Sequence, residues 1–176
     1  MCIFCISGVC LFFSPTLGTI RSMKEAFLYT DGGARGNPGI AGAGAVLFDA
    51  KGATLKEGCL FLGNTTNNVA EYQAVLLGLQ LTMQYFGKAQ CKEVYLTVRL
   101  DSELVQKQLT GQYRVKHADL KPLSAAVQRV REEWFPRARF EHVRREKNKH
   151  ADRLANEAMD KAHHCGSVRV PTDPLL

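Results

Sequence analysis

The sequence of 176 residues contains no apolar run of about 18 residues, the length that a helix needs to cross a bilayer. It also lacks internal repeats and low-complexity blocks, which excludes a solenoid. No second Cys-x-x-Cys pair accompanies Cys2 and Cys5, which excludes a zinc ribbon, and the other cysteines are too scattered for a disulfide framework. These absences favour a reduced, cytoplasmic chain with no membrane partner.

The composition is that of an ordinary folded protein. Hydrophobic residues make up 45% and charged residues 23%, which excludes disordered, collagen-like and coiled-coil classes. The length favours one domain. Lysine and arginine number 23 against 17 acidic residues, a net charge of +6. This excess suits a polyanionic partner, although many proteins without one are equally basic.

A secretory signal has a positive charge before its apolar stretch, and no such charge precedes the apolar stretch at residues 1–13. Residues 1–13 are almost all apolar, and the first basic residue is Arg21. We expect residues 1–22 to be an extension, with Met23 as a candidate natural start; a weak targeting segment is the alternative. The predicted domain spans 23–162, followed by a tail at 163–176 in which His163, His164 and Cys165 are not expected to bind metal.

Hydrophobic periodicity predicts alternating strands and helices. Strands are expected at 27–30, 41–48, 53–62, 94–98 and 139–143, and helices at 69–86, 102–109, 120–134 and 150–162. The glycine-rich stretch 32–39 is expected to form a turn. This order predicts an α/β fold in which helices cover both faces of a mixed sheet.

Four acidic residues stand where folding alone does not require them. Asp31 and Asp101 end predicted strands, Glu71 lies in the first turn of a helix, and Asp152 lies in the last helix. Clustered carboxylates repel one another unless a cation lies between them, and Mg²⁺ prefers such oxygen ligands. Each residue also has a structural interpretation: a helix-terminal charge for Glu71, an N-cap for Asp101, and a partner of Arg153 or Lys149 for Asp152.

Four stretches of the sequence, taken in order, resemble the motifs of type 1 ribonuclease H. They are residues 29–39 (YTDGGARGNPG), 66–72 (TNNVAEY), 100–105 (LDSELV) and 147–155 (KNKHADRLA). The similarity covers about 24–161 and is greatest to the short, reverse-transcriptase-like branch. It implies a five-stranded mixed sheet in the order 3-2-1-4-5.

The resemblance further implies hydrolysis of the RNA strand of an RNA–DNA hybrid to 5′-phosphate and 3′-hydroxyl ends. Two Mg²⁺ ions, with Mn²⁺ able to replace them, would be held by the four carboxylates. Asp31 would bridge both ions, Glu71 and Asp101 would help to hold one, and Asp152 would complete the other.

Selectivity for RNA requires contacts to the 2′-hydroxyl group. The resemblance assigns substrate contacts to the backbone at Gly32, Gly33, Ala34 and Arg35, to the amides of Asn67 and Asn68, and to Asn37. The alternative for Asn67 and Asn68 is capping of the following helix.

The sequence departs from the family pattern in two places. It lacks the long basic, tryptophan-rich insertion that grips DNA in some members, and the basic residues Lys107, Arg114 and Lys116 are candidates for a reduced version. It also lacks the Gly-His-x-Gly loop before the last carboxylate, where Arg145 is expected to act on the departing phosphate. His150 is predicted to be a solvated helix residue.

Two other functions stay open at this point. One is a non-catalytic module that binds hybrid or duplex RNA, which the presence of all four carboxylates disfavours. The other is the nuclease domain of a retroelement polyprotein. A monomer that needs no protein partner is expected.

Overall fold

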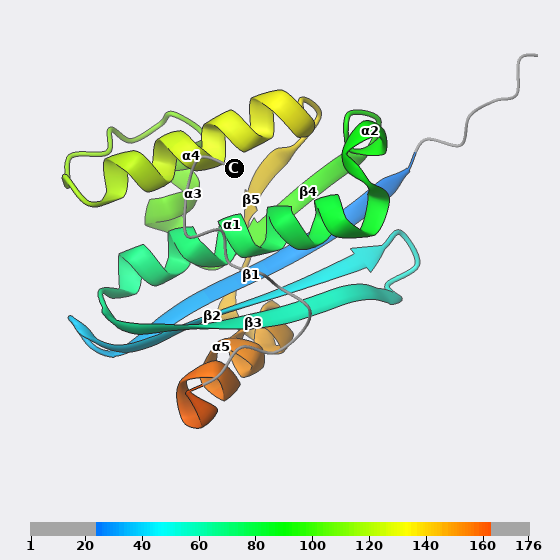
Figure 1. Ribbon diagram of the computed structural model, residues 1–176. Coiled ribbons are helices and arrows are strands. Elements are labelled where there is room, and N and C mark those ends of the chain that lie inside the picture. The colour runs from blue at the N-terminus through cyan, green and yellow to red at the C-terminus, as the bar shows by residue number, and fades with distance from the viewer. Residues whose placement is uncertain (1–23, 163–176) are drawn as a thin grey trace, which may run out of the picture.

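The computed structural model describes residues 24–162, which form a five-stranded sheet with helices on both faces (Figure 1). The predicted extension at 1–22, with Cys2 and Cys5, and the predicted tail with His163, His164 and Cys165 lie outside the described residues. Within 24–162, no helix has the length and apolar character needed to cross a membrane.

The sheet has the predicted strand order β3-β2-β1-β4-β5. Strands β1, β2 and β3 pair antiparallel, whereas β4 pairs parallel with both β1 and β5. The strands are β1 (Glu25–Gly36), β2 (Gly39–Asp49), β3 (Thr54–Thr65), β4 (Tyr95–Leu100) and β5 (Arg139–His142). The helices are α1 (Asn67–Phe86), α2 (Lys88–Cys91), α3 (Glu103–Leu109), α4 (Leu120–Trp134), the 3-10 turn η1 (Arg145–Lys147) and α5 (Lys149–Lys161).

Helix α1 lies between the sheet and α4, whereas α5 covers the opposite face of the sheet (Figure 1). Alternate residues of β1 and β4, such as Leu28 and Val98, are fully buried beneath α1. Because α1 has neighbours on two sides, it is apolar around most of its circumference rather than along a single stripe. Its end at Phe86, followed by Gly87, is the end predicted from the sequence.

Small residues in β2 allow α5 to pack very close to the sheet. A Cβ atom at Gly44 would lie 2.3 Å from the carbonyl oxygen of Ala151, and one at Gly42 would lie 2.4 Å from that of Ala155. Because Gly44 pairs with Asp31, this contact fixes the first turn of α5, and with it Asp152, near Asp31 in the middle of β1.

Strand β1 is longer than predicted. The glycine-rich stretch 32–39 was expected to be a turn, but residues 32–36 continue the strand and pair with residues 39–43 of β2. Only Asn37 and Pro38 form the turn. Ladder hydrogen bonds come from the backbone, so a run of glycines can form a strand where neighbouring elements require small residues. The short helices α2 and η1 were not predicted.

Candidate active site

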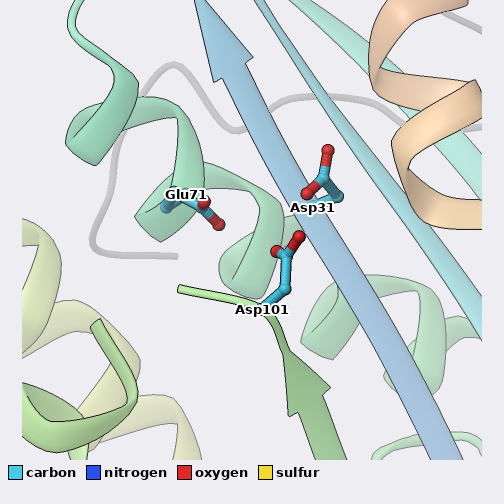
Figure 2. A group of neighbouring side chains, drawn as sticks. All are labelled: Asp31, Glu71 and Asp101. Carbon is cyan, nitrogen blue, oxygen red and sulfur yellow. The ribbon is translucent and has the colours of Figure 1, made fainter. Parts of the chain in front are cut away.

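Three carboxylates from three separate segments meet where β4 ends beside the middle of β1 (Figure 2). Strands β1 and β4 run parallel with Thr30 opposite Leu100, so the next residues, Asp31 and Asp101, lie side by side. Glu71 approaches from α1, and one oxygen from each of the three side chains lies within 4.8 Å of the others. The convergence that spacing alone did not show is therefore present in the fold.

Burial and mutual repulsion make the ionised forms of these carboxylates unfavourable. Asp31 is 5% exposed and Glu71 is 6% exposed. Burial, followed by the charge of Asp101, raises the pKa of Asp31 to about 8. Burial and the charges of Asp31 and Asp101 raise the pKa of Glu71 well above its ordinary value. A bound cation would remove both penalties.

Gly32 sets the position of Glu71. Its backbone N–H donates a hydrogen bond to the Glu71 carboxylate, which partly opposes the rise in the pKa of that group. A Cβ atom at Gly32 would lie 2.2 Å from the carbonyl carbon of Ala70, so only glycine allows β1 and α1 to approach this closely.

The cluster fits a hard divalent cation. Within residues 24–162, Oε2 of Glu71 is buried and has no hydrogen-bond partner, an arrangement that is costly unless something else binds the oxygen. All the possible metal ligands in the cluster are carboxylate oxygens, which Mg²⁺ and Mn²⁺ prefer and softer metals do not. Asp31, Glu71 and Asp101 are therefore the residues that would hold a metal ion.

Asp152 lies in the same pocket but stands apart from the buried triad. It occupies the first turn of α5, and its Oδ1 accepts a hydrogen bond from Arg145 at 3.2 Å. The Arg145 side chain is 76% exposed, and its pairing with Asp152 raises the pKa of the guanidinium. The alternative that Asp152 pairs with Arg153 or Lys149 is wrong, because its basic partner within residues 24–162 is Arg145, and Arg153 pairs with Glu157.

The carboxylates open into a pocket of about 540 Å³. Its lining includes most of the residues expected from the sequence: Asp31, Gly32, Gly33, Ala34, Arg35, Asn67, Glu71, Asp101, Arg145 and Asp152. Ser102, Asn156 and Met159 also line it and were not predicted. Asn37 and Asn68 are not part of this lining. The backbone of β1 next to Asp31 thus forms one wall, and Asn67 at the start of α1 adjoins it.

Asn37 and Asn67 link the β1–β2 turn to the start of α1. The Ala34 N–H donates to Oδ1 of Asn67 at 3.2 Å, and the Asn67 N–H donates to Oδ1 of Asn37 at 3.3 Å. The N-cap of α1 is Thr66, whose hydroxyl accepts from the N–H of Val69 at 3.4 Å. The alternative that Asn67 or Asn68 caps this helix is therefore wrong.

Two further structural interpretations are corrected by the fold. Asp101 does not cap α3, because Ser102 is the N-cap and accepts from the N–H of Val105. His150 is half-buried rather than solvated: its ring packs edge-on against Phe48, and Nε2 lies 2.9 Å from Glu57. The close packing of α5 on β2 encloses this histidine.

The three candidate basic residues lie on α3 and in the loop that follows it. Lys107 forms an ion pair with Glu103 at 2.6 Å and contacts the ring of Tyr113, whereas Arg114 and Lys116 are exposed. None of the three basic residues lines the carboxylate pocket. A role in holding the substrate stays a prediction.

Asn148 is a positioning residue that sequence reasoning missed. It is 1% exposed, and its Nδ2 donates to the carbonyl of Thr30 at 2.9 Å and to Oδ1 of Asp101 at 3.3 Å. It therefore joins the segment before α5 to both carboxylate-bearing strands. In the sequence, Asn148 was marked only by lying in the family-like stretch 147–155, which does not show that it contacts Thr30 or Asp101.

The raised pKa of Asp31 predicts how the stability of the metal-free protein depends on pH. Between the ordinary value of 3.8 and about 8, the folded state binds a proton that the unfolded state releases, so stability falls as pH rises. We expect the melting temperature in chelator to fall between about pH 5 and pH 8, and to fall less in Asp31→Asn. Parallel melting curves for the two proteins would contradict this assignment.

Known proteins resemble the chain in both sequence and fold. The family described as Reverse transcriptase-like matches residues 29–158. The chain is 44% identical over 158 residues to Bifunctional protein Rv2228c of Mycobacterium tuberculosis, covering 85% of this chain but only 39% of that protein. It is 34% identical over 160 residues to Ribonuclease H of Alcanivorax borkumensis, covering 81% of this chain and 96% of that one.

A solved structure of a ribonuclease H1 is also similar to this chain in sequence and fold. LC11-RNase H1, isolated from compost and crystallised in complex with RNA/DNA hybrid, is 47% identical to this chain with a TM-score of 0.75. The match covers 78% of this chain and 98% of that one.

Proposed function

This chain belongs to the ribonuclease H family of reverse-transcriptase-like domains, and on that basis we propose that it hydrolyses the RNA strand of RNA–DNA hybrids. The observation that carries the proposal is the buried triad of Asp31, Glu71 and Asp101, whose charges repel and whose Glu71 Oε2 lacks a partner within residues 24–162. A structural role does not account for three converging carboxylates, whereas a metal-dependent nuclease requires them.

Two Mg²⁺ ions are proposed as the cofactors, with Mn²⁺ able to replace them. Asp31, Glu71 and Asp101 hold the buried side of the site, and Asp152 completes it from α5. When bound, such a pair of ions activates a water molecule and stabilises the leaving 3′ oxygen of an in-line displacement. Asn148 keeps Asp101 oriented toward Asp31, and Gly32 keeps Glu71 in place.

Recognition of RNA is assigned to the wall of the pocket beside the carboxylates. The backbone of residues 32–35 and the side chain of Asn67 line this wall, and hydrogen-bonding groups of this kind can contact a 2′-hydroxyl. The side-chain oxygen of Asn37 accepts from the backbone N–H of Asn67, so the effect of Asn37 on binding is indirect. A substrate contact by Asn68 stays a prediction. The monomeric state and the cytoplasmic location of the protein also stay predictions.

Cleavage of end-labelled 12-mer duplexes in Mg²⁺ tests the substrate assignment. We expect cleavage of the RNA strand in an RNA–DNA hybrid and none of a DNA duplex of the same sequence. A hybrid in which one ribonucleotide is replaced by its 2′-deoxy form should resist cutting next to that nucleotide. Binding of the hybrid without any cleavage would instead support the non-catalytic module.

Arg145 is expected to act on the phosphate in place of a loop histidine. Its guanidinium keeps its charge at every working pH and binds phosphate through two donors, so it can attract the departing phosphate but not transfer a proton. Arg145→Ala should lower kcat more than it raises KM, and Arg145→Lys should restore only part of the loss. An unchanged kcat in Arg145→Ala would show that the residue only pairs with Asp152.

The basic residues after Asp101 are expected to hold the DNA strand. Replacing Lys107, Arg114 and Lys116 together by Ala should raise KM several-fold, with little change in kcat, because contacts to phosphate contribute to binding of substrate and transition state alike. A matched control removes three exposed charges elsewhere: Lys88, Lys92 and Arg129. Equal KM values for the two triple variants would place the DNA contacts on another surface.

A further inference from the structure

A second pocket lies on the face of the sheet that carries α5, and we propose that it binds a nucleoside monophosphate. Its volume is about 450 Å³, within the range of small-ligand sites. Its lining is Phe27, Tyr29, Phe48, Asp49, Ala50, Lys51, Gly52, Arg99, Lys147, Asn148, His150 and Ala151. None of these residues lines the carboxylate pocket, so this inference goes beyond the proposed nuclease activity.

The wall formed by the sheet is aromatic. Phe27 and Tyr29 alternate along β1 on this face, and Phe48 lies opposite Phe27 on β2. The rings of Tyr29 and Phe48 meet edge to face, with centroids 5.5 Å apart. All three side chains are only partly buried, which is unusual for aromatic residues near the centre of a sheet. A flat apolar group such as a nucleobase would cover them.

Arg99 extends this wall with a planar cation. Its guanidinium carbon lies 4.4 Å from the centroid of the Phe27 ring, and the group donates to the hydroxyl of Tyr29 at 2.7 Å and to Glu141 at 3.2 Å. These two hydrogen bonds fix the orientation of the guanidinium plane. They use two of the five donors that arginine carries, which leaves others for an anionic ligand.

Two lysines add positive charge at the rim. Lys51 lies in the β2–β3 turn and Lys147 in η1; both are exposed, and neither forms an ion pair within residues 24–162. The acidic residue in the lining, Asp49, offsets only part of the positive charge of Lys51, Lys147 and Arg99. Asp49 accepts from two backbone N–H groups of its own turn, and Glu57 pairs with His150. The remaining charge favours a phosphate group.

Asn148 also lines this pocket, and it is 1% exposed. Its Oδ1 has no hydrogen-bond partner in the part of the chain that the structure describes, but the atom has no exposed surface. The ligand contacts therefore come from the aromatic rings and the cations. The rings correspond to the base of a nucleotide, and the cations correspond to its phosphate.

The test is a titration of ¹⁵N-labelled protein with AMP, followed by amide chemical shifts, in the absence of divalent metal. We expect saturable shifts at Phe48, Lys51, Gly52 and Arg99. Lys51→Ala/Lys147→Ala should raise the dissociation constant at least about tenfold, the size of one charge-assisted hydrogen bond. Lys88→Ala/Lys92→Ala is the matched control, because these lysines lie over Trp134 in the helical layer on the other face and should leave the affinity unchanged.

Adenosine and inorganic phosphate complete the experiment. Each should shift the same amides with weaker affinity than AMP, and Phe48→Leu should weaken adenosine more than phosphate because it removes an aromatic contact. Absence of shifts at the pocket with AMP at millimolar concentration would overturn the proposal. Phosphate binding as tightly as AMP would also overturn it, since the aromatic wall would then contribute nothing.

Discussion

Replacing Asp31 with Asn is expected to abolish hybrid cleavage while making the metal-free protein more stable. The change removes the carboxylate that interacts with all three others, Glu71, Asp101 and Asp152. A lost ion costs several kcal/mol of transition-state stabilisation, or at least about a thousandfold in rate. It also removes a buried charge whose pKa is raised to about 8 by burial and by its neighbours, so the free energy of unfolding should rise at pH 8 and above.

Single-turnover cleavage and chemical unfolding in chelator measure the two effects of Asp31→Asn. Asp119→Asn is a suitable control, because its side chain is 74% exposed beside His117 and away from the cluster, and both quantities should stay unchanged. An Asp31→Asn enzyme that kept more than about a tenth of the wild-type rate would contradict the two-ion assignment.

Replacing Gly32 with Ala is expected to cause a large loss of both stability and cleavage. The added Cβ would lie 2.2 Å from the carbonyl carbon of Ala70 and 2.3 Å from the backbone nitrogen of Glu71, so α1 must move away from β1. Overpacking typically costs about 1–3 kcal/mol and occasionally more, and the upper end applies where the clash is with backbone atoms. The shift would also carry Glu71 away from Asp31, which should reduce the cleavage rate of the protein that still folds.

The neighbouring glycine provides the matched control for Gly32→Ala. A Cβ atom at Gly33 would meet only the methyl group of Met159 at 3.6 Å, an ordinary contact. Gly33→Ala should therefore change the free energy of unfolding by less than about 1 kcal/mol. If urea unfolding gave equal midpoints for the two variants, the close packing of β1 on α1 would not be what requires glycine at position 32.

Much of the fold could be predicted because local patterns and global structure agree. The alternation in 41–48 and the periodicity in 69–86 correspond to β2 and α1, and Gly87 marks the end of α1 as expected. The strand order came from the resemblance in the four motifs. Position along the chain also placed Asp101 directly after a strand, which is where the structure has it, whereas Asp31 was expected at a strand end and lies in the middle of β1.

What the sequence could not show are contacts between distant segments. The strand character of residues 32–36 depends on β2 across the turn, and the pairing of Arg145 with Asp152 depends on how η1 leads into α5. Asn148 reaches Thr30 and Asp101, which lie 118 and 47 residues away along the chain. Such contacts form only when the sheet and the helices pack together, so the spacing of residues within one segment does not predict them.

The chemistry of the products tests the central claim most directly. Wild-type protein is stripped with chelator, incubated with an RNA–DNA hybrid, and then supplied with Mg²⁺. The account predicts no cleavage before Mg²⁺ is added and, afterwards, fragments that carry 5′-phosphate and 3′-hydroxyl ends, because water activated at the carboxylate cluster attacks the phosphate. Cleavage in chelator that yields 2′,3′-cyclic phosphate ends would contradict it, since the RNA's own 2′-hydroxyl would then be the nucleophile.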